Sequence, residues 1–375
     1  MTLGILGGGQ LARMTAQAAI RLGIDVRILT PSPAGPTAPF AGTTVADWTD
    51  PFVLRDWADG CDAVTVESEW APADRLLDVL PDGCALRPHP STLHTIRHKG
   101  RQKAAFDADG LAVPRWSACD TLEAAHLAAI EYGWPVLAKR YEGSYDGYGN
   151  ATCRTPEELT AAWDALSADD GVLIEAWVPF EREVSALVAR RPGGESAVYP
   201  VIGSEHRDHQ LVTAYAPAGL EPTVEAEARR LALAAIEAVD GVGLLAVEMF
   251  VLPDGRVLLN EIAPRPHNTG HLTIEACHTS QFENHARAAL DLPLGDPALR
   301  VPAACMVNVV GQAKSDGGVA LVPESLDVPG ATVHLYGKAS TRPRRKMGHV
   351  TATAPDVESA RKAAAAAVDA LYRHG

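Results

Sequence analysis

Two apolar segments, 244–252 and 256–262, are joined by the step Asp254-Gly255, and this arrangement constrains the fold more than any other feature. Asp-Gly between strand-like segments is a strong signal for a β-hairpin with a two-residue loop. In that register Pro253 faces Arg256, and each residue before Pro253 faces the residue that lies equally far after Arg256. The sequence therefore predicts a pair of antiparallel strands with a defined alignment.

The same register places Glu248 opposite Glu261. Two carboxylates directly opposite each other on one sheet face repel, and a divalent cation relieves the repulsion. Hard oxygen ligands favour Mg²⁺, with Mn²⁺ as a substitute. The alternative is a pair of exposed glutamates on an edge hairpin, and the apolar neighbours argue against it. The pair Glu248 and Glu261 therefore predicts a metal site.

Length and charge limit the remaining classes. A chain of 375 residues is too long for one compact core, so two or three lobes are expected. The net charge of −14 argues against a general nucleic-acid or membrane binder, and no apolar run is long enough to span a bilayer. The six cysteines show no paired metal spacing and no signal peptide is evident, so a cytoplasmic protein with free thiols is expected.

The first residues alternate between strand and helix patterns. Residues 3–6, 25–29 and 62–66 read as strands and 10–22 as a helix, which predicts a small parallel α/β unit over residues 1–88. Pro88 and Pro90 mark its boundary. Beyond it, Ser91 is expected to cap a helix running to about residue 110. The further expectations are strands at 134–140 and 171–178, a helix capped near Thr155, a meander at 182–189 and 196–203, helices at 223–239, 281–290 and 356–372, and short β segments after Pro302.

Gly7-Gly8-Gly9-Gln10-Leu11-Ala12 matches a dinucleotide-binding fingerprint with alanine in the last place. Such a turn brings backbone amides at a helix N-terminus close to a phosphate. A nicotinamide or flavin enzyme also needs an acid at the end of the second strand, where this chain has Thr30 and Pro31. The turn is therefore predicted to face an anion, but not NAD.

Lys139 ends an apolar strand, so it must find an anion or leave the core. It is followed by a glycine-rich loop, 143–149, which can fold its amides over a phosphate chain, although it lacks the Walker pattern. A long hairpin turn is the alternative. Glu175-Ala176-Trp177-Val178 follows another apolar strand and suits a purine ring, and Glu183 is placed to bind ribose hydroxyls, although a core strand would read the same way.

The densest polar run, 260–271, begins beside a metal-candidate glutamate. It leaves its strand at Pro264, so Arg265, His267 and Asn268 are expected to project beside the metal. Arginine there can bind bicarbonate or a transferring phosphoryl group through two hydrogen bonds. A surface loop is the alternative.

Residues 336–338 and 342–349 form a basic island in an acidic chain, with Lys338 and Arg345 among its cations. A basic surface hairpin is the ordinary explanation of such runs. In a chain of this charge, the island predicts a phosphate-bearing substrate instead.

Taken together these motifs resemble the ATP-grasp enzymes, in particular the family of N5-carboxyaminoimidazole ribonucleotide synthetases. The resemblance rests on Gly7–Met14, Tyr145–Gly149, Asn260–Asn268 and Arg345–His349 and covers nearly the whole chain. It implies an α/β and α+β fold: a Rossmann-like pre-ATP-grasp domain over 1–88, an ATP-grasp domain over 89–295 with a mobile subdomain at about 112–172, and a small β-rich C-terminal lobe over 300–375. It also implies a homodimer that acts on small molecules, with neither nucleic acid nor membrane as a partner.

The implied reaction is carboxylation of 5-aminoimidazole ribonucleotide with bicarbonate and ATP, through carboxyphosphate, in purine biosynthesis. Arg265, Lys139 and Asp146 would be catalytic, and Glu248 and Glu261 would hold magnesium. ATP would be bound by Lys99, Lys139, Gly143, Ser144, Tyr145, Asp146, Gly147, Tyr148, Gly149, Glu175, Ala176, Trp177, Val178, Glu183, His206, Asn260 and Glu261. The ribonucleotide would be bound by Gln10, Leu11, Glu67, Tyr145, Asp146, His267, Asn268, Lys338 and Arg345.

Three positions depart from the family's pattern. Tyr148 stands where an arginine or lysine is common, and Glu205-His206 and Glu67-Ser68-Glu69-Trp70 also differ. These departures keep two alternatives open. One is an ATP-grasp ligase that joins a different carboxylate and amine, and the other is a nucleotide-binding sensor without turnover.

Overall fold

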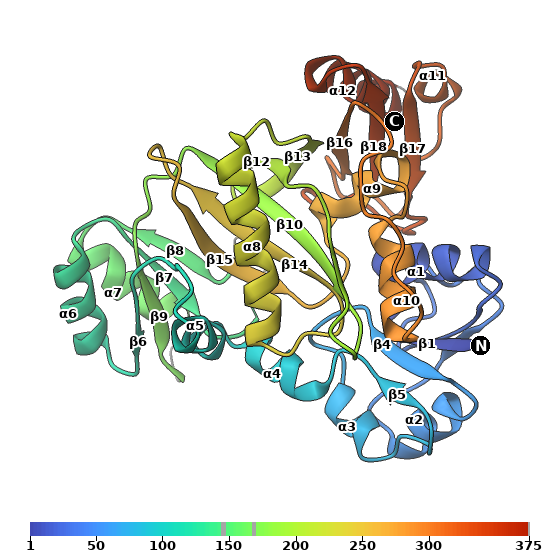
Figure 1. Ribbon diagram of the computed structural model, residues 1–375, viewed down its shortest axis with the longest axis horizontal. Helices are drawn as coiled ribbons and strands as arrows, with labels where there is room; N and C mark the ends of the chain where they lie inside the picture. Colours follow the sequence, from blue (N-terminus) through green and yellow to red (C-terminus); the bar gives the residue numbers. More distant parts are fainter. Residues whose placement is uncertain (144–147, 167–169, 374–375) are drawn as a thin grey trace.

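The N-terminal residues form a five-stranded parallel sheet in the order β3-β2-β1-β4-β5, as predicted for this part of the chain (Figure 1). The computed structural model describes residues 1–143, 148–166 and 170–373. The strands are β1 (Thr2–Leu6), β2 (Asp25–Thr30), β3 (Thr43–Val45), β4 (Ala63–Val66) and β5 (Ala85–Leu86), and the helices between them are α1 (Gln10–Arg21), α2 (Pro51–Ala58) and α3 (Ala73–Leu77). The central strands are buried, as apolar parallel strands covered on both faces must be.

The single helix expected from Ser91 to about residue 110 is in fact two helices, α4 (Pro90–Arg97) and α5 (Lys99–Ala108). His98 separates them with an extended backbone, at φ −101° and ψ 105°. Its imidazole accepts a hydrogen bond from the first turn of α5, and His89 rather than Ser91 caps α4. Side-chain capping at His98 therefore competes successfully with helix continuation.

A four-stranded antiparallel sheet, β6-β9-β7-β8, forms the lobe at the left of Figure 1. Its strands are β6 (Trp116–Cys119), β7 (Val136–Arg140), β8 (Asn150–Cys153) and β9 (Val172–Ala176), and one buried cluster packs them against α6 (Leu122–Tyr132) and α7 (Pro156–Ala165). Thr155 caps α7, as predicted. The sequence-based prediction lacks β6, β8 and α6, because two of these are four-residue strands and the third is too rich in alanine to show a clear apolar face.

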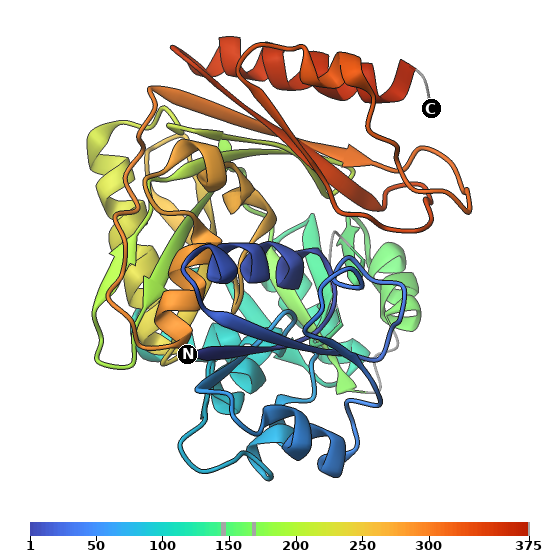
Figure 2. The ribbon, with the colours of Figure 1, turned by 90° about the vertical axis from the view of Figure 1, so that its right-hand side faces the viewer.

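The largest sheet is antiparallel, in the order β15-β14-β10-β12-β13-β16-β18-β17, with β11 paired to β10. Its strands are β10 (Arg182–Arg190), β11 (Ser196–Val198), β12 (Ile202–Arg207), β13 (Gln210–Ala216), β14 (Gly243–Val251), β15 (Val257–Ala263), β16 (Ala303–Val310), β17 (Ala331–Leu335) and β18 (Lys346–Ala354). The C-terminal strands therefore continue the central sheet through the β13–β16 pair. Figure 2 shows α12 (Val357–Arg373) lying across them. Further helices in this part of the chain are η2 (Asn268–Leu272), α9 (Thr273–Ala276), α10 (Gln281–Ala289) and α11 (Pro323–Leu326).

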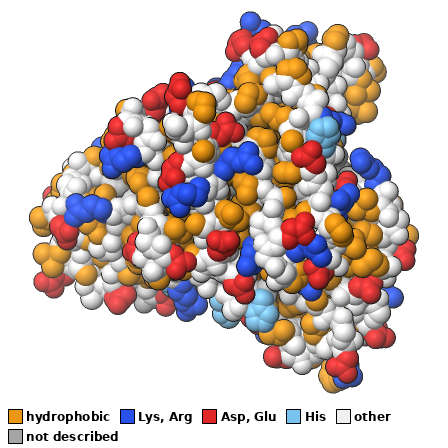
Figure 3. All heavy atoms as spheres, in the orientation of Figure 1, with side chains coloured by type: hydrophobic (Ala, Val, Ile, Leu, Met, Phe, Trp, Pro, Cys, Tyr) orange, Lys and Arg blue, Asp and Glu red, His pale blue; other side chains and the backbone are white. Residues whose placement is uncertain are grey.

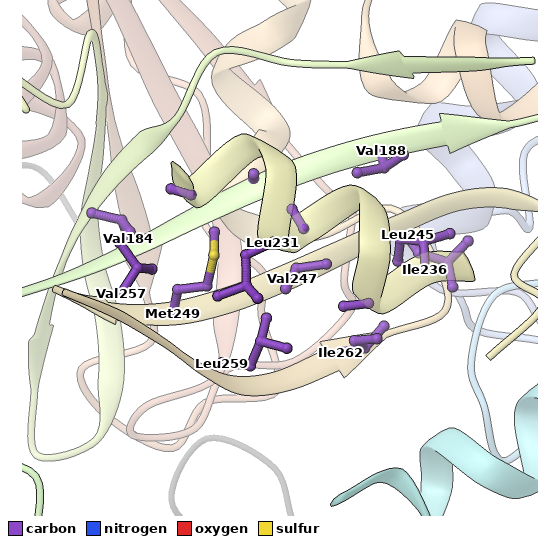
Figure 4. Packing of buried hydrophobic residues seen from close by; sticks show 14 of the residues in the cluster. Val184, Val188, Leu231, Ile236, Leu245, Val247, Met249, Val257, Leu259 and Ile262 are labelled. Carbon is purple, nitrogen blue, oxygen red and sulfur yellow. The ribbon is translucent and has the colours of Figure 1, made fainter. Parts of the chain in front are cut away.

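Helix α8 (Pro222–Ala238) packs on one face of β10, β14 and β15 (Figure 4). Leu231 from the helix and Val247, Met249 and Leu259 from the strands are all at most 1% exposed. Burying a side chain of this size stabilises the fold by about 1.5–3 kcal/mol. Because strand side chains alternate between faces, the burial of Val247 and Met249 under α8 turns Glu248 to the opposite face.

The hairpin between β14 and β15 differs from the prediction at its tip. Leu252 pairs with Arg256 around a three-residue loop in which Gly255 has φ 82°, so Pro253 does not face Arg256. A register shift next to Glu248 then restores the predicted alignment, and Glu248 faces Glu261. The longer loop and the β-bulge compensate for each other by one residue.

Acidic and basic side chains are interspersed over the face of the molecule seen in Figure 3. All six cysteines are free thiols. Within the described residues, no helix is both long and apolar enough to cross a bilayer.

Candidate active site

Two cavities meet at the glutamate pair of the β14–β15 hairpin, and a third shares lining residues with them. The first two, of about 480 and 620 Å³, share five lining residues: Glu248, Glu261, His267, Asn268 and Lys346. The first is also lined by Gln10, Leu11, Glu67, Lys99 and Arg265, and the second by Glu183, His206 and Asn260. A third cavity, of about 500 Å³, is lined by Gln10, Tyr148, Lys338, Arg345 and Lys346. The structure thus gathers predicted residues from all parts of the chain.

Each glutamate of the pair has its own nitrogen partner. Lys99 forms an ion pair with Glu261, and Nε2 of His267 lies 3.1 Å from Oε1 of Glu248. Burial raises the pKa of Glu248, but the hydrogen bond to His267 and the electrostatic influence of His267, His206 and Lys99 together outweigh burial and lower that pKa to about 2. The repulsion expected from the sequence is therefore already relieved by Lys99 and His267.

The donor set around Glu248 and Glu261 suits a hard cation. Asn260 and Asn268 line the second cavity together with the two carboxylates, and their amide groups add further oxygen atoms there. In the described part of the chain, no third acidic, histidine or cysteine side chain completes a metal cluster. A magnesium ion held here would keep open positions for water or phosphate oxygens, as this metal commonly does.

A chain of hydroxyl groups orients the His267 ring. Ser185 Oγ donates to Thr269 Oγ1 at 2.8 Å, and Thr269 Oγ1 lies 2.9 Å from Nδ1 of His267. Because Thr269 accepts from Ser185, its own hydrogen can donate to Nδ1, which leaves the proton of a neutral ring on Nε2. Buried Gln281 holds the backbone on both sides, since it accepts from His267 N–H at 2.9 Å and donates to its carbonyl at 2.8 Å. The Nε2–H of His267 therefore points at Glu248.

Lys139 lies in a buried group of charges that the sequence predicts only in part. Glu175 is 1% exposed and forms ion pairs with Lys139 and, at 2.7 Å, with Lys103. Burial raises the pKa of Glu175, but the two lysines outweigh burial and lower that pKa to about 2. Lys139 also lies 3.4 Å from the side-chain oxygen of Asn260, which lines the second cavity. Lys103 was not predicted; its place four residues after Lys99, on the same face of a helix, was the available signal.

Arg265 connects the large sheet to the N-terminal lobe. Its Nε and Nη2 lie 2.7 and 3.3 Å from the two carboxylate oxygens of Glu69. Burial raises the pKa of Glu69, but the charge of Arg265, its hydrogen bonds and smaller contributions together outweigh burial and lower that pKa. Two nitrogens of the Arg265 guanidinium group are therefore already bonded to Glu69, which was not predicted as a site residue. Arg265 also lines the first cavity.

The glycine turn does face an anion, as predicted, but the anion belongs to the chain. The Glu67 carboxylate accepts hydrogen bonds from the backbone N–H groups of Gly9 and Leu11. A Cβ at Gly9 would collide with that carboxylate, so a larger residue there would displace Glu67 from the turn. Burial raises the pKa of Glu67. Glu67 thus occupies the position that a dinucleotide phosphate would need.

Among the described residues predicted for ATP, Glu183, His206 and Asn260 line the second cavity, whereas Lys99 lines the first. Glu183 pairs with His206 at 2.6 Å on the cavity wall. Beyond the buried Glu175, Trp177 is 46% exposed and Val178 packs with Phe250. In the loop, Gly143 and Gly149 have positive φ, and Ser144, Tyr145, Asp146 and Gly147 lie outside the described residues. Ala176 bonds through its backbone N–H to Arg115.

The third cavity gathers the basic island. Lys338, Arg342, Arg344, Arg345 and Lys346 all line it. Lys338 donates to the carbonyl of Lys346 at 2.7 Å, and Arg345 donates to the carbonyl and hydroxyl oxygens of Ser340. Burial, followed by the charge of Arg345, lowers the pKa of Lys338 to about 8. A concave surface with this much positive charge suits a phosphate group.

Three family models match the chain in succession. They are the ribonucleotide synthetase preATP-grasp domain at residues 1–97, the ATP-grasp domain at 104–282 and the phosphoribosylaminoimidazole carboxylase C-terminal domain at 304–363. The chain is 40% identical to N5-carboxyaminoimidazole ribonucleotide synthase of Mycobacterium tuberculosis, over 94% of this chain and 83% of that protein. It is also 40% identical to phosphoribosylaminoimidazole carboxylase of Schizosaccharomyces pombe, over 93% of this chain but only 64% of that longer protein.

Solved structures agree with these matches. The N5-carboxyaminoimidazole ribonucleotide synthetase of Thermus thermophilus has a TM-score of 0.86 and 39% identity, over 97% of both chains. The N5-carboxyaminoimidazole synthase of Aspergillus clavatus, solved with ADP and 5-aminoimidazole ribonucleotide, has a TM-score of 0.85 and 31% identity, over 99% of this chain and 98% of that one. The chain therefore belongs to the N5-carboxyaminoimidazole ribonucleotide synthase family of ATP-grasp ligases.

Proposed function

We propose that this protein carboxylates 5-aminoimidazole ribonucleotide with bicarbonate, using ATP, and releases N5-carboxyaminoimidazole ribonucleotide, ADP and phosphate. The observation that carries the proposal is the position of Glu248 and Glu261 on the wall shared by the first two cavities. Gln10 and Lys346 connect the first cavity to the cation-lined third one. A nucleotide and a phosphate-bearing substrate can thus approach the same carboxylates from different sides.

ATP is assigned to the second cavity, with its ribose toward Glu183 and His206 and its phosphates toward Lys99 and Lys139. Glu248 and Glu261 would hold Mg²⁺, which would neutralise negative charge on the phosphates during phosphoryl transfer. The loop 143–149, with its backbone amides and Asp146, is assigned to the phosphates and the ribonucleotide.

A bicarbonate oxygen attacks the γ-phosphorus of ATP, ADP leaves, and carboxyphosphate forms. The amine of the ribonucleotide then takes the carboxyl group, and phosphate leaves. Arg265 holds the anionic intermediate in the first cavity, while His267, Asn268, Gln10, Leu11 and Glu67 border the ribonucleotide. The chain acts chiefly by positioning and by stabilising charge, and closure of the site keeps water from the intermediate.

The 5′-phosphate of the ribonucleotide is assigned to Lys338 and Arg345 in the third cavity. We further propose the lobe boundaries 1–88, 89–295 and 300–375, closure of the four-stranded sheet with α6 and α7 over ATP, and a cytoplasmic homodimer.

Release of phosphate from ATP, measured over a panel of amine ribonucleotides with and without bicarbonate, tests the function. Fast release is expected only when bicarbonate and 5-aminoimidazole ribonucleotide are both present. Tyr148 is 60% exposed and lines the third cavity, which favours a different acceptor as the second candidate function. Release that ignores bicarbonate would favour that ligase. An absence of release with every amine would favour the sensor.

A further inference from the structure

A buried group of three charges lies behind the second cavity. Lys103 on α5, Lys139 on β7 and Glu175 on β9 are 2%, 6% and 1% exposed. Lys103 contacts Oε1 of Glu175 at 2.7 Å, and Lys139 pairs with Oε2 of the same carboxylate. The group therefore holds two positive charges against one negative charge.

Buried charges of this kind are costly unless each one is paired. The single carboxylate can neutralise only one lysine fully, so one positive charge is in excess. Lys103 is anchored away from the cavity, because its Nζ also lies 3.5 Å from the carbonyl oxygen of Leu259. Lys139 lies 3.4 Å from the side-chain oxygen of Asn260, and Asn260 lines the second cavity. The excess charge is thus available on the side where an anion can enter.

We propose that Lys103 is a positioning residue for nucleotide binding, which stays with Glu175 as its counterion when the ammonium group of Lys139 turns to the phosphates of ATP. This inference rests on the proposed function only in assigning a nucleotide to the second cavity. Without Lys103, Lys139 is the sole counterion of a buried carboxylate. Its movement toward a phosphate would then leave Glu175 unpaired, and that cost opposes nucleotide binding.

The test is calorimetric titration of Mg·ADP into wild-type protein, Lys103→Met, Glu175→Gln and the double variant. Lys103→Met should raise the Kd by about ten- to a hundredfold, the range for one charge-assisted contact of ~1.5–3 kcal/mol. Arg101→Met removes an exposed positive charge from the same helix and should leave the Kd unchanged. The double variant should bind close to the wild-type level, since the neutral amide that replaces the carboxylate of Glu175 needs no counterion.

A merely structural role for Lys103 would lower the melting temperature of Lys103→Met and leave its Kd for Mg·ADP unchanged, and this result would overturn the proposal. Failure of Glu175→Gln to restore binding to Lys103→Met would overturn it as well. If Lys103→Met does not fold, the Kd of Glu175→Gln for Mg·ADP tests the proposal by itself. This variant releases Lys139 from its counterion, so it should bind Mg·ADP at least as tightly as wild type, and weaker binding would overturn the proposal. Wild-type protein that binds Mg·ADP but does not carboxylate the ribonucleotide would refute the proposed function and leave this inference standing.

Discussion

The carboxylate of Glu67 accepts a hydrogen bond from the backbone N–H of Gly9, so the N-terminus of α1 already holds an anion. NAD should therefore give no thermal stabilisation, whereas Mg·ADP should stabilise the protein by ~2.7 kcal/mol at a hundred times its Kd. Thermal unfolding with each ligand measures this difference. A saturable shift with NAD would mean that Glu67 yields its place to a phosphate.

Glutamine at position 248 or 261 should nearly abolish turnover, because each variant loses one of the two proposed metal ligands. Facing charges alone would predict that the metal-free variants melt no lower than wild type. The structure reverses that expectation for Glu261→Gln, since Lys99, with a side chain only 13% exposed, loses its ion pair. The free energy of unfolding should fall by about 1–2 kcal/mol. This is less than the ~3–5 kcal/mol expected when a fully buried pair is broken, because Glu261 is partly exposed.

Urea unfolding of the metal-free proteins measures the change, and Mg·ADP should stabilise both variants less than wild type. Glu237→Gln, which changes an exposed glutamate on α8, is the matched control and should behave as wild type. Full activity in the variants at positions 248 and 261 would refute the metal assignment.

Glu175 should make the stability of the protein depend on pH in the acid range. Its pKa is lowered from 4.5 to about 2 in the folded state, where burial is outweighed by Lys103 and Lys139. A depressed pKa contributes stability above the unfolded value, here about 3 kcal/mol, and that stability is lost as the pH falls through the folded value. Wild type should therefore lose stability relative to Glu175→Gln between about pH 5 and pH 2. Parallel pH profiles of the two free energies of unfolding would contradict the ion-paired state.

Arg345→Ala should weaken binding of the ribonucleotide, with a change of about ten- to a hundredfold in its KM or kcat/KM. This is the range for the loss of one charge-assisted contact of ~1.5–3 kcal/mol. The KM for ATP should stay nearly unchanged, and the preference for the nucleotide over its nucleoside should almost disappear. Lys362→Ala, which removes an exposed charge on α12, is the control. A raised KM for ATP together with an intact preference for the nucleotide over the nucleoside would show that the basic island belongs to the ATP site.

Much of the fold follows from local sequence. The parallel N-terminal sheet, the strands around Glu248 and Glu261 and the closing helix were predicted from apolar periodicity, because each signal lies within a few neighbouring residues. Errors arose where a polar side chain or a short element decided the outcome. His98 ends one helix and caps the next, and a bulge beside Glu248 cancels the extra residue of the hairpin loop.

The sequence by itself determined which kinds of side chain the site contains: two facing glutamates, a polar segment with Arg265 and His267, and a basic island. Only the tertiary structure decided which charge neutralises which. Glu67 occupies the glycine turn, Glu69 holds Arg265 across 196 residues of chain, and Lys103 shares Glu175 with Lys139. A buried charge must be paired wherever the fold happens to place it, and its partner comes from a distant segment that local sequence patterns do not identify.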